Sequence, residues 1–202
     1  MSPAAALASD VFQTYLKLAI ALLGGSGVLL VILTYGLKRQ IGNVWRTYVG
    51  WLFMVPIVLA VVFAGRAATI VGITLLALFG FKEFARATGL YRDWWMTGAV
   101  NAGIVAVAAS SLVDDPLLNR AGWYGLFMTL PVYIVSLILM IPIIRNRAKG
   151  QLQHVALAIL GFIYLGWMFS HVGFLANSPH AYGYLLFLVL AVEGSDVAAF
   201  LA

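Results

Sequence analysis

Seven long apolar runs follow one another along the chain, and short segments between them contain most of its charged residues. A helix needs about 20 mostly apolar residues to cross the hydrocarbon layer of a bilayer. Measured against that length, the runs predict transmembrane helices at 12–37, 48–64, 67–84, 95–113, 121–144, 152–175 and from 181 to the end. The break between the second and third helices depends on the pair Gly65-Arg66 alone. We therefore predict an all-α fold, a polytopic integral membrane protein with about seven transmembrane helices.

Composition strengthens this prediction, because 63% of the 202 residues are hydrophobic and only 9% are charged. A soluble globular domain is about half apolar and about a quarter charged, so a water-soluble fold is excluded. The chain has no cysteine, which also excludes disulfides and thiolate metal sites. No linker or internal repeat is visible, and we expect residues 1–202 to form a single transmembrane domain.

The basic residues alternate between the predicted loops. The first, third and fifth loops hold three each, the second and fourth hold one each, and the sixth holds none. Cytoplasmic loops retain lysine and arginine, so this pattern predicts an external N-terminus and a last helix that ends at the cytoplasm. Insertion topology accounts for the net charge of +5, and we expect no nucleic-acid partner.

Two acidic residues, Glu193 and Asp196, interrupt the last apolar run. A charged residue at the centre of a span costs about 2.5–3.5 kcal/mol, and intramembrane acids often mark functional sites. Their spacing of three places both on one helix face. They indicate a cation or phosphate–metal site that opens to the cytosol. Alternatively, they pair with bases on neighbouring helices, or the last run is a re-entrant segment. His154 and His171 lie near opposite ends of one predicted helix, so no histidine ligand set is expected.

Other polar or small residues in the predicted helices favour structural roles. Glu83 and Arg86, at a spacing of three, are expected to form a surface pair. In the fourth predicted helix, Ala102, Ala106 and Ser110 form a stripe of small residues at a spacing of four. Such stripes allow close packing of membrane helices, and we expect the stripe to face a neighbouring helix.

Two short segments resemble the phosphatidate cytidylyltransferase (CDP-diacylglycerol synthase) family. The segment DVAAF at 196–200 matches the family pattern Asp-x-Gly/Ala-Ala-Tyr/Phe, and FGFKEFARATGL at 79–90 is similar to its stretch with Glu-Phe/Tyr at the end of an early helix. The family's Ser-Pro-x-Lys-Thr stretch and its Lys-Arg…Lys-Asp block, which ends near His-Gly-Gly and Asp-Arg, are absent. We therefore expect residues 1–202 to be the N-terminal part of a longer chain, inactive by itself.

The resemblance implies an enzyme of phospholipid biosynthesis that joins CTP to phosphatidate, giving CDP-diacylglycerol and pyrophosphate. It implies Mg²⁺ as the cofactor, with Asp196 as a contact to the metal or the metal–nucleotide complex. Glu193 is a second metal candidate, although the family pattern does not require an acid there. No catalytic residue is assigned. The implied location is the bacterial inner (cell) membrane, with the site facing the cytoplasm.

Two other functions remain open. A secondary transporter or channel could bind cations or protons at Glu193 and Asp196. A CTP-dependent lipid-alcohol kinase would also be embedded in membrane lipid. The oligomeric state stays open as well, with a homodimer among the alternatives.

Overall fold

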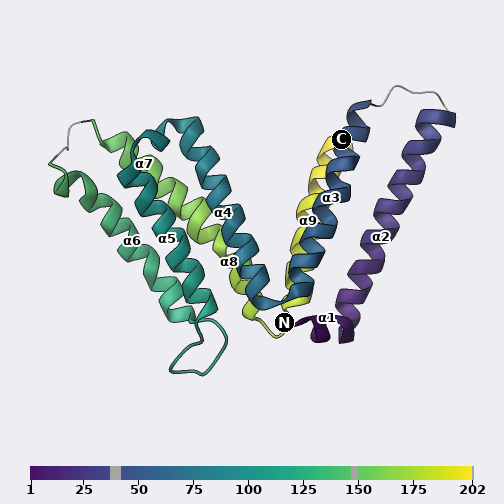
Figure 1. Ribbon diagram of the computed structural model, residues 1–202, viewed down its shortest axis with the longest axis horizontal. Helices are drawn as coiled ribbons and strands as arrows, with labels where there is room; N and C mark the ends of the chain where they lie inside the picture. The colour runs from purple at the N-terminus through teal and green to yellow at the C-terminus, as the bar shows by residue number, and fades with distance from the viewer. Residues whose placement is uncertain (37–41, 147–149, 202) are drawn as a thin grey trace. The chain divides into compact units, whose positions relative to one another are not determined.

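The computed structural model describes residues 1–36, 42–146 and 150–201, with the backbone alone at 36, 42–43, 193–194 and 196–201. Over these ranges the chain forms helices joined by short turns and by a longer loop at 113–123, without a strand (Figure 1). Six of the described helical segments are long and apolar enough to cross a membrane. The predicted all-α polytopic membrane fold is confirmed.

The chain divides into two compact units. Met1–Gly65 and Tyr182–Ala202 form one, which we call the terminal unit, and Arg66–Ala181 forms the other, the central unit. The single transmembrane domain stays a prediction, because compact units within one chain need not be independent domains.

The terminal unit consists of α1 (Pro3–Ala8), α2 (Asp10–Val31), α3 (Gly42–Ala64) and α9 (Ala181–Leu201). A π-helical turn, Ile32–Gly36, extends α2. The Ser9 hydroxyl caps the N-terminus of α2 by accepting a hydrogen bond from the Phe12 amide at 3.3 Å. The helix boundaries agree with the apolar runs to within several residues.

The central unit consists of α4 (Arg66–Thr88), α5 (Trp94–Leu112), α6 (Tyr124–Ile144), α7 (Leu152–Gly161) and α8 (Phe169–Phe174). Short 3-10 turns occur at Leu90–Arg92 and Leu175–Asn177, and a π-helical stretch, Phe162–Met168, joins α7 to α8 within the sixth predicted helix. The break at Gly65-Arg66 is confirmed: Gly65 has φ +111°, which ends α3, and α4 begins at the next residue.

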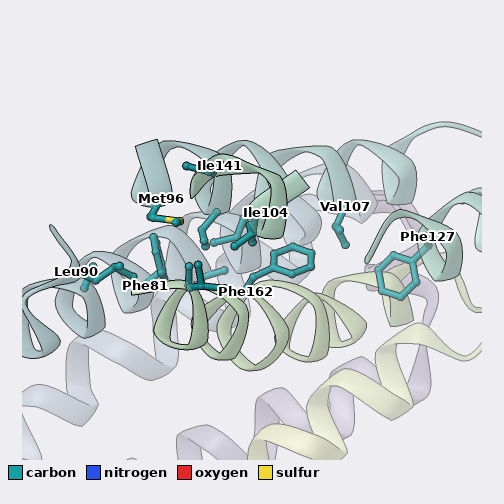
Figure 2. Close-up of a cluster of buried hydrophobic side chains, with 14 residues drawn as sticks. Phe81, Leu90, Met96, Ile104, Val107, Phe127, Ile141 and Phe162 are labelled. Carbon is teal, nitrogen blue, oxygen red and sulfur yellow. The ribbon is translucent and has the colours of Figure 1, made fainter. Parts of the chain in front are cut away.

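A cluster of buried apolar side chains fills the centre of the central unit (Figure 2). Phe81 of α4, Ile104 of α5 and Phe162 of the π-helical stretch are at most 1% exposed within it. At Gly103, a Cβ atom would lie 2.8 Å from the Ile134 methyl group and 3.0 Å from the Phe162 ring. The absence of a side chain at Gly103 therefore allows α5 to approach both neighbours.

The predicted small-residue stripe on α5 is wrong for Ala102, and only its last member is fully buried. Ser110 is buried, but Ala102 is exposed and Ala106 is only half-buried. The buried face instead contains Gly103 together with larger apolar residues such as Val107. The stripe could not identify the packed face because the lipid-exposed face of a membrane helix is also apolar.

Arg66, the first residue of α4, connects three helix ends of the central unit. Its guanidinium donates to the Asn177 side-chain oxygen at 2.6 Å and to the carbonyls of Ser111 and Leu112 at 3.2 and 2.9 Å. It also forms a 3.0 Å ion pair with Asp114. Two of these acceptors are among the last carbonyls of α5, which have no partner within their own helix.

The predicted topology places even-numbered loops on one side of the membrane and odd-numbered loops on the other, and the contacts of the central unit agree with this. Arg66, Asp114 and Asn177 come from the second, fourth and sixth loops and meet at one end of α4. Asp93 and Arg145, from the third and fifth loops, meet beyond the other end of α4. Of the basic residues used in the topology prediction, Lys38, Arg39, Arg147 and Lys149 lie outside the described residues.

Candidate functional site

The predicted metal residues, Glu193 and Asp196, belong to α9 in the terminal unit. The backbone is helical through both positions, so they lie three residues apart on one continuous helix of 21 residues. That length is sufficient to cross a bilayer. The side chains of both acids lie outside the described residues, and their metal role stays a prediction.

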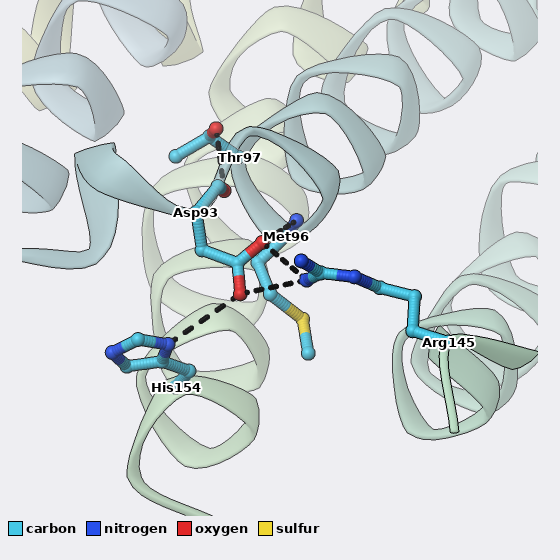
Figure 3. Close-up of polar contacts among 5 residues, drawn as sticks. All are labelled: Asp93, Met96, Thr97, Arg145 and His154. Carbon is cyan, nitrogen blue, oxygen red and sulfur yellow. Dashed lines mark hydrogen bonds and ion pairs between the residues drawn. The ribbon is translucent and has the colours of Figure 1, made fainter. Parts of the chain in front are cut away.

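The described part of the chain contains a second polar cluster, formed by Asp93, Arg145 and His154 in the central unit (Figure 3). One terminal nitrogen of Arg145 lies 2.9 Å from Oδ1 and 3.1 Å from Oδ2 of Asp93. Nδ1 of His154 lies 3.5 Å from Oδ2 of the same carboxylate. The cluster therefore joins three helices through one acid.

The local sequence explains why Asp93 and Arg145 occupy these positions. Asp93 is the N-cap of α5, and its side chain accepts a hydrogen bond from the Met96 amide at 3.4 Å. Arg145 is the C-cap of α6. A negative charge is favoured at a helix N-terminus and a positive charge at a C-terminus, so each residue also interacts favourably with its own helix.

Burial makes this ion pair structurally important. The side chain of Asp93 is 7% exposed and that of Arg145 is 21% exposed. A carboxylate so far removed from water needs charged or hydrogen-bonding partners, because desolvation of a lone charge is costly. Arg145 and the Met96 amide supply these partners. The geometry supports a role in holding the ends of α5 and α6 together.

His154 adds α7 to the cluster. Its Nδ1 atom is buried and makes no hydrogen bond with any described residue. The atom nearest to it in the cluster is Oδ2 of Asp93, at 3.5 Å. From its position in the sequence, His154 is expected only not to share a metal with His171. The structure instead places it beside Asp93.

Two residues of this cluster were missed from the sequence. Asp93 directly precedes an apolar helix, which is the usual signal for an N-cap, but it was not singled out. Arg145 was counted only among the basic residues of a loop. The Glu83–Arg86 pair is confirmed at 3.2 Å, on the surface of α4. Among the described residues, no group of three or more histidine, aspartate or glutamate side chains could hold a metal ion.

Most of the chain is similar to a known protein family. Residues 45–202 match the family model described as the cytidylyltransferase family. The matched region begins in α3 and includes the Asp93–Arg145–His154 cluster and both acids of α9. No curated protein and no solved structure matches the chain significantly.

Proposed function

Because this chain belongs to the cytidylyltransferase family, we propose that it transfers a cytidylyl group from CTP to phosphatidate, forming CDP-diacylglycerol and pyrophosphate. The family match over most of the chain is the observation on which the proposal depends. The six described membrane-length helices support a lipid acceptor, since a lipid phosphate lies at the surface of the same bilayer. The resemblance at 196–200 supports phosphatidate in particular.

The proposed reaction is a substitution at the α-phosphorus of CTP. An oxygen of the lipid phosphate forms a bond to that phosphorus, and the bond to the bridging oxygen of pyrophosphate breaks. Transfers of this kind are catalysed mainly by positioning the reactants and by neutralising the charge of their oxygens. The reaction thus requires cationic groups near the nucleotide phosphates.

We further propose that Asp196, with Glu193 as a second candidate, holds Mg²⁺ for this reaction. Mg²⁺ takes oxygen ligands and usually only one or two protein carboxylates, which fits the donor chemistry of two acids three residues apart on α9. Bound there, the ion would neutralise phosphate oxygens of the nucleotide. The predicted topology directs this end of α9 to the cytoplasm of a bacterial cell, where CTP is found.

The Asp93–Arg145–His154 cluster would act by positioning. Its three residues lie at the helix ends that the topology prediction assigns to the cytoplasmic side. The carboxylate of Asp93 already accepts from Arg145, so its role is to keep three helix ends in register. We assign it no contact with substrate.

CTP labelled at different phosphorus atoms tests the reaction. With the full-length protein, phosphatidate and Mg²⁺, label at the α-phosphorus should enter the lipid, and label at the γ-phosphorus should leave in pyrophosphate. A lipid-alcohol kinase would transfer the γ label to its lipid acceptor instead. Transfer of the γ label, or no lipid product at all, would contradict the proposal.

The metal assignment is tested with Asp196→Asn. We expect kcat to fall roughly a hundredfold or more, the effect of losing one electrostatic contact to a transition state. Asp10→Asn is the control, because Asp10 is exposed at the start of α2 and lies outside the matched residues 45–202. If Asp196→Asn retains the turnover of the control, Asp196 is not part of the site.

A further inference from the structure

An apolar groove lies within the terminal unit, and we propose that it binds one acyl chain of the lipid acceptor. This inference rests on the proposed function, because it concerns the acceptor of that reaction. The groove has a volume of about 140 Å³. It is lined by Tyr15, Ala19, Leu22 and Leu23 of α2, by Trp51, Met54, Val55, Val58 and Leu59 of α3, and by Leu186, Val189 and Leu190 of α9.

The spacing of these residues shows that each helix contributes one face. On α2, α3 and α9 the lining residues recur at intervals of three and four, the repeat of a helix surface. Apart from the rings of Tyr15 and Trp51, every lining side chain is purely aliphatic or a thioether. The groove is thus a continuous hydrocarbon surface assembled from three helices.

Contacts on either side of the groove join its helices, all three of them at one end and α2 with α3 towards the other. At one end, the Phe12 ring lies 5.9 Å from that of Phe63 and 5.6 Å from that of Tyr182, between centroids. Towards the other end, the Tyr48 hydroxyl donates to the Leu23 carbonyl at 2.9 Å. Beyond it, the Trp45 indole donates to the Thr34 hydroxyl at 2.8 Å. The groove lies between these contacts, which hold the helices that line it.

The depth of the groove identifies its occupant as an acyl chain. Leu22 and Leu23 lie near the middle of Asp10–Tyr35, and Met54 and Val55 near the middle of Val44–Ala64, both segments of membrane-spanning length. At that depth the surrounding medium is hydrocarbon. An apolar surface gives water no hydrogen-bonding partners, so hydrocarbon is the favoured contact there. An acyl chain provides that contact.

The groove also shares a helix with the proposed metal residues. Leu186, Val189 and Leu190 line it from α9, and Glu193 and Asp196 follow on the same helix. Asp196 comes six residues after Leu190, about 9 Å farther along the helix axis. A lipid whose chain lies along this part of α9 would have its phosphate farther along the helix, in the direction of the acids.

Filling the groove tests this inference. Ala19→Phe places a ring in the groove, whereas Ala21→Phe makes the same change at an exposed position of α2 that does not line it. We expect Ala19→Phe to raise the KM for long-chain phosphatidate by roughly tenfold or more, as changes in apolar pockets do. The KM values for short-chain phosphatidate and CTP should not change. Equal effects on both chain lengths, or equal effects of both variants, would overturn the inference.

A measurement without turnover separates this inference from the proposed reaction. Phosphatidate with a photoreactive group on its acyl chain should label α2, α3 and α9 in the unmodified protein and in Ala21→Phe, and should label Ala19→Phe much less. Unlabelled phosphatidate should compete better than phosphatidylcholine. Equal labelling of the three proteins would overturn the inference that the groove binds the acyl chain. Equal competition by phosphatidate and phosphatidylcholine would show that the groove holds bulk lipid, and would overturn it too. Absence of product from both chain lengths, with labelling as expected, would count against the reaction alone.

Discussion

The central unit and the terminal unit hold their helices together by different means. In the central unit, 50% of the residues in the apolar stretch of α5 are buried, whereas the corresponding share is 6% for α2 and for α3 in the terminal unit. The central unit has a large apolar cluster and a buried ion pair. The terminal unit has a small cluster near Phe12 and polar contacts from Trp45 and Tyr48.

This difference reflects the solvent. Lipid tails are as apolar as leucine, so membrane helices associate through close packing and hydrogen bonds rather than through exclusion of water. Helices that pack closely, as around Gly103, leave no space for a lipid chain between them. Helices joined mainly near their ends leave hydrocarbon surface available. The comparison predicts that polar and steric changes in the central unit cost stability, while equivalent changes in the terminal unit cost less.

The largest expected effect is that of Asp93→Ala. The substitution leaves the partly buried Arg145 without its carboxylate and removes the cap of α5. Breaking such a pair should lower the free energy of unfolding by about 3 kcal/mol. Denaturant titration in detergent measures it. Glu83→Ala, which breaks the exposed pair with Arg86, should cost less than about 1 kcal/mol. Similar losses for both variants would show that the Asp93 pair is not the stronger contact.

Gly103→Leu should have the next largest effect. A side chain at this position meets Ile134 and Phe162 at less than normal contact distance, and overpacking of this kind costs about 2 kcal/mol. Gly98→Leu provides the comparison on the same helix, because a Cβ at Gly98 meets no atom within 4 Å. Thermal unfolding in detergent should show a lower midpoint for Gly103→Leu only. An unchanged midpoint would mean that α5 is not closely packed there.

The smallest effect is expected in the terminal unit, for Tyr48→Phe. It removes the hydrogen bond to the Leu23 carbonyl, and such bonds between membrane helices contribute about 0.6 kcal/mol on average. Tyr133→Phe, at a residue of α6 that is 67% exposed, controls for loss of a tyrosine hydroxyl. Hydrogen exchange of the α2 and α3 amides should increase for Tyr48→Phe alone. A loss as large as that of Asp93→Ala would remove the contrast between the units.

Much of the fold was predictable because crossing a bilayer imposes a length and a composition. The apolar runs located the helices, and even the weak signal of Gly65-Arg66 marked a true helix boundary. The packed face of α5 was not predictable from hydropathy. Its buried positions and its lipid-exposed positions are both apolar, so Ala102 and Gly103 differ in environment without differing in character.

The candidate sites show the same limit. Glu193 and Asp196 could be named from sequence because acids within an apolar run are conspicuous. Asp93 and Arg145 lie in loops where charges are expected, and 52 positions separate them. Local pattern can identify an N-cap there, but only the folded chain reveals that a distant arginine and His154 share its carboxylate.

The contacts of Arg66 impose an order on biosynthesis. Its acceptors at Ser111 and Leu112 are made 45 and 46 residues later, and Asn177 is made 111 residues later. At about 5–20 residues per second, the last of these emerges roughly 6–22 s after Arg66 itself. Until Ser111 and Leu112 have been made, the guanidinium must be accommodated by water, lipid headgroups or the insertion machinery. The final arrangement of α4 can therefore be reached only when synthesis of the central unit is almost complete.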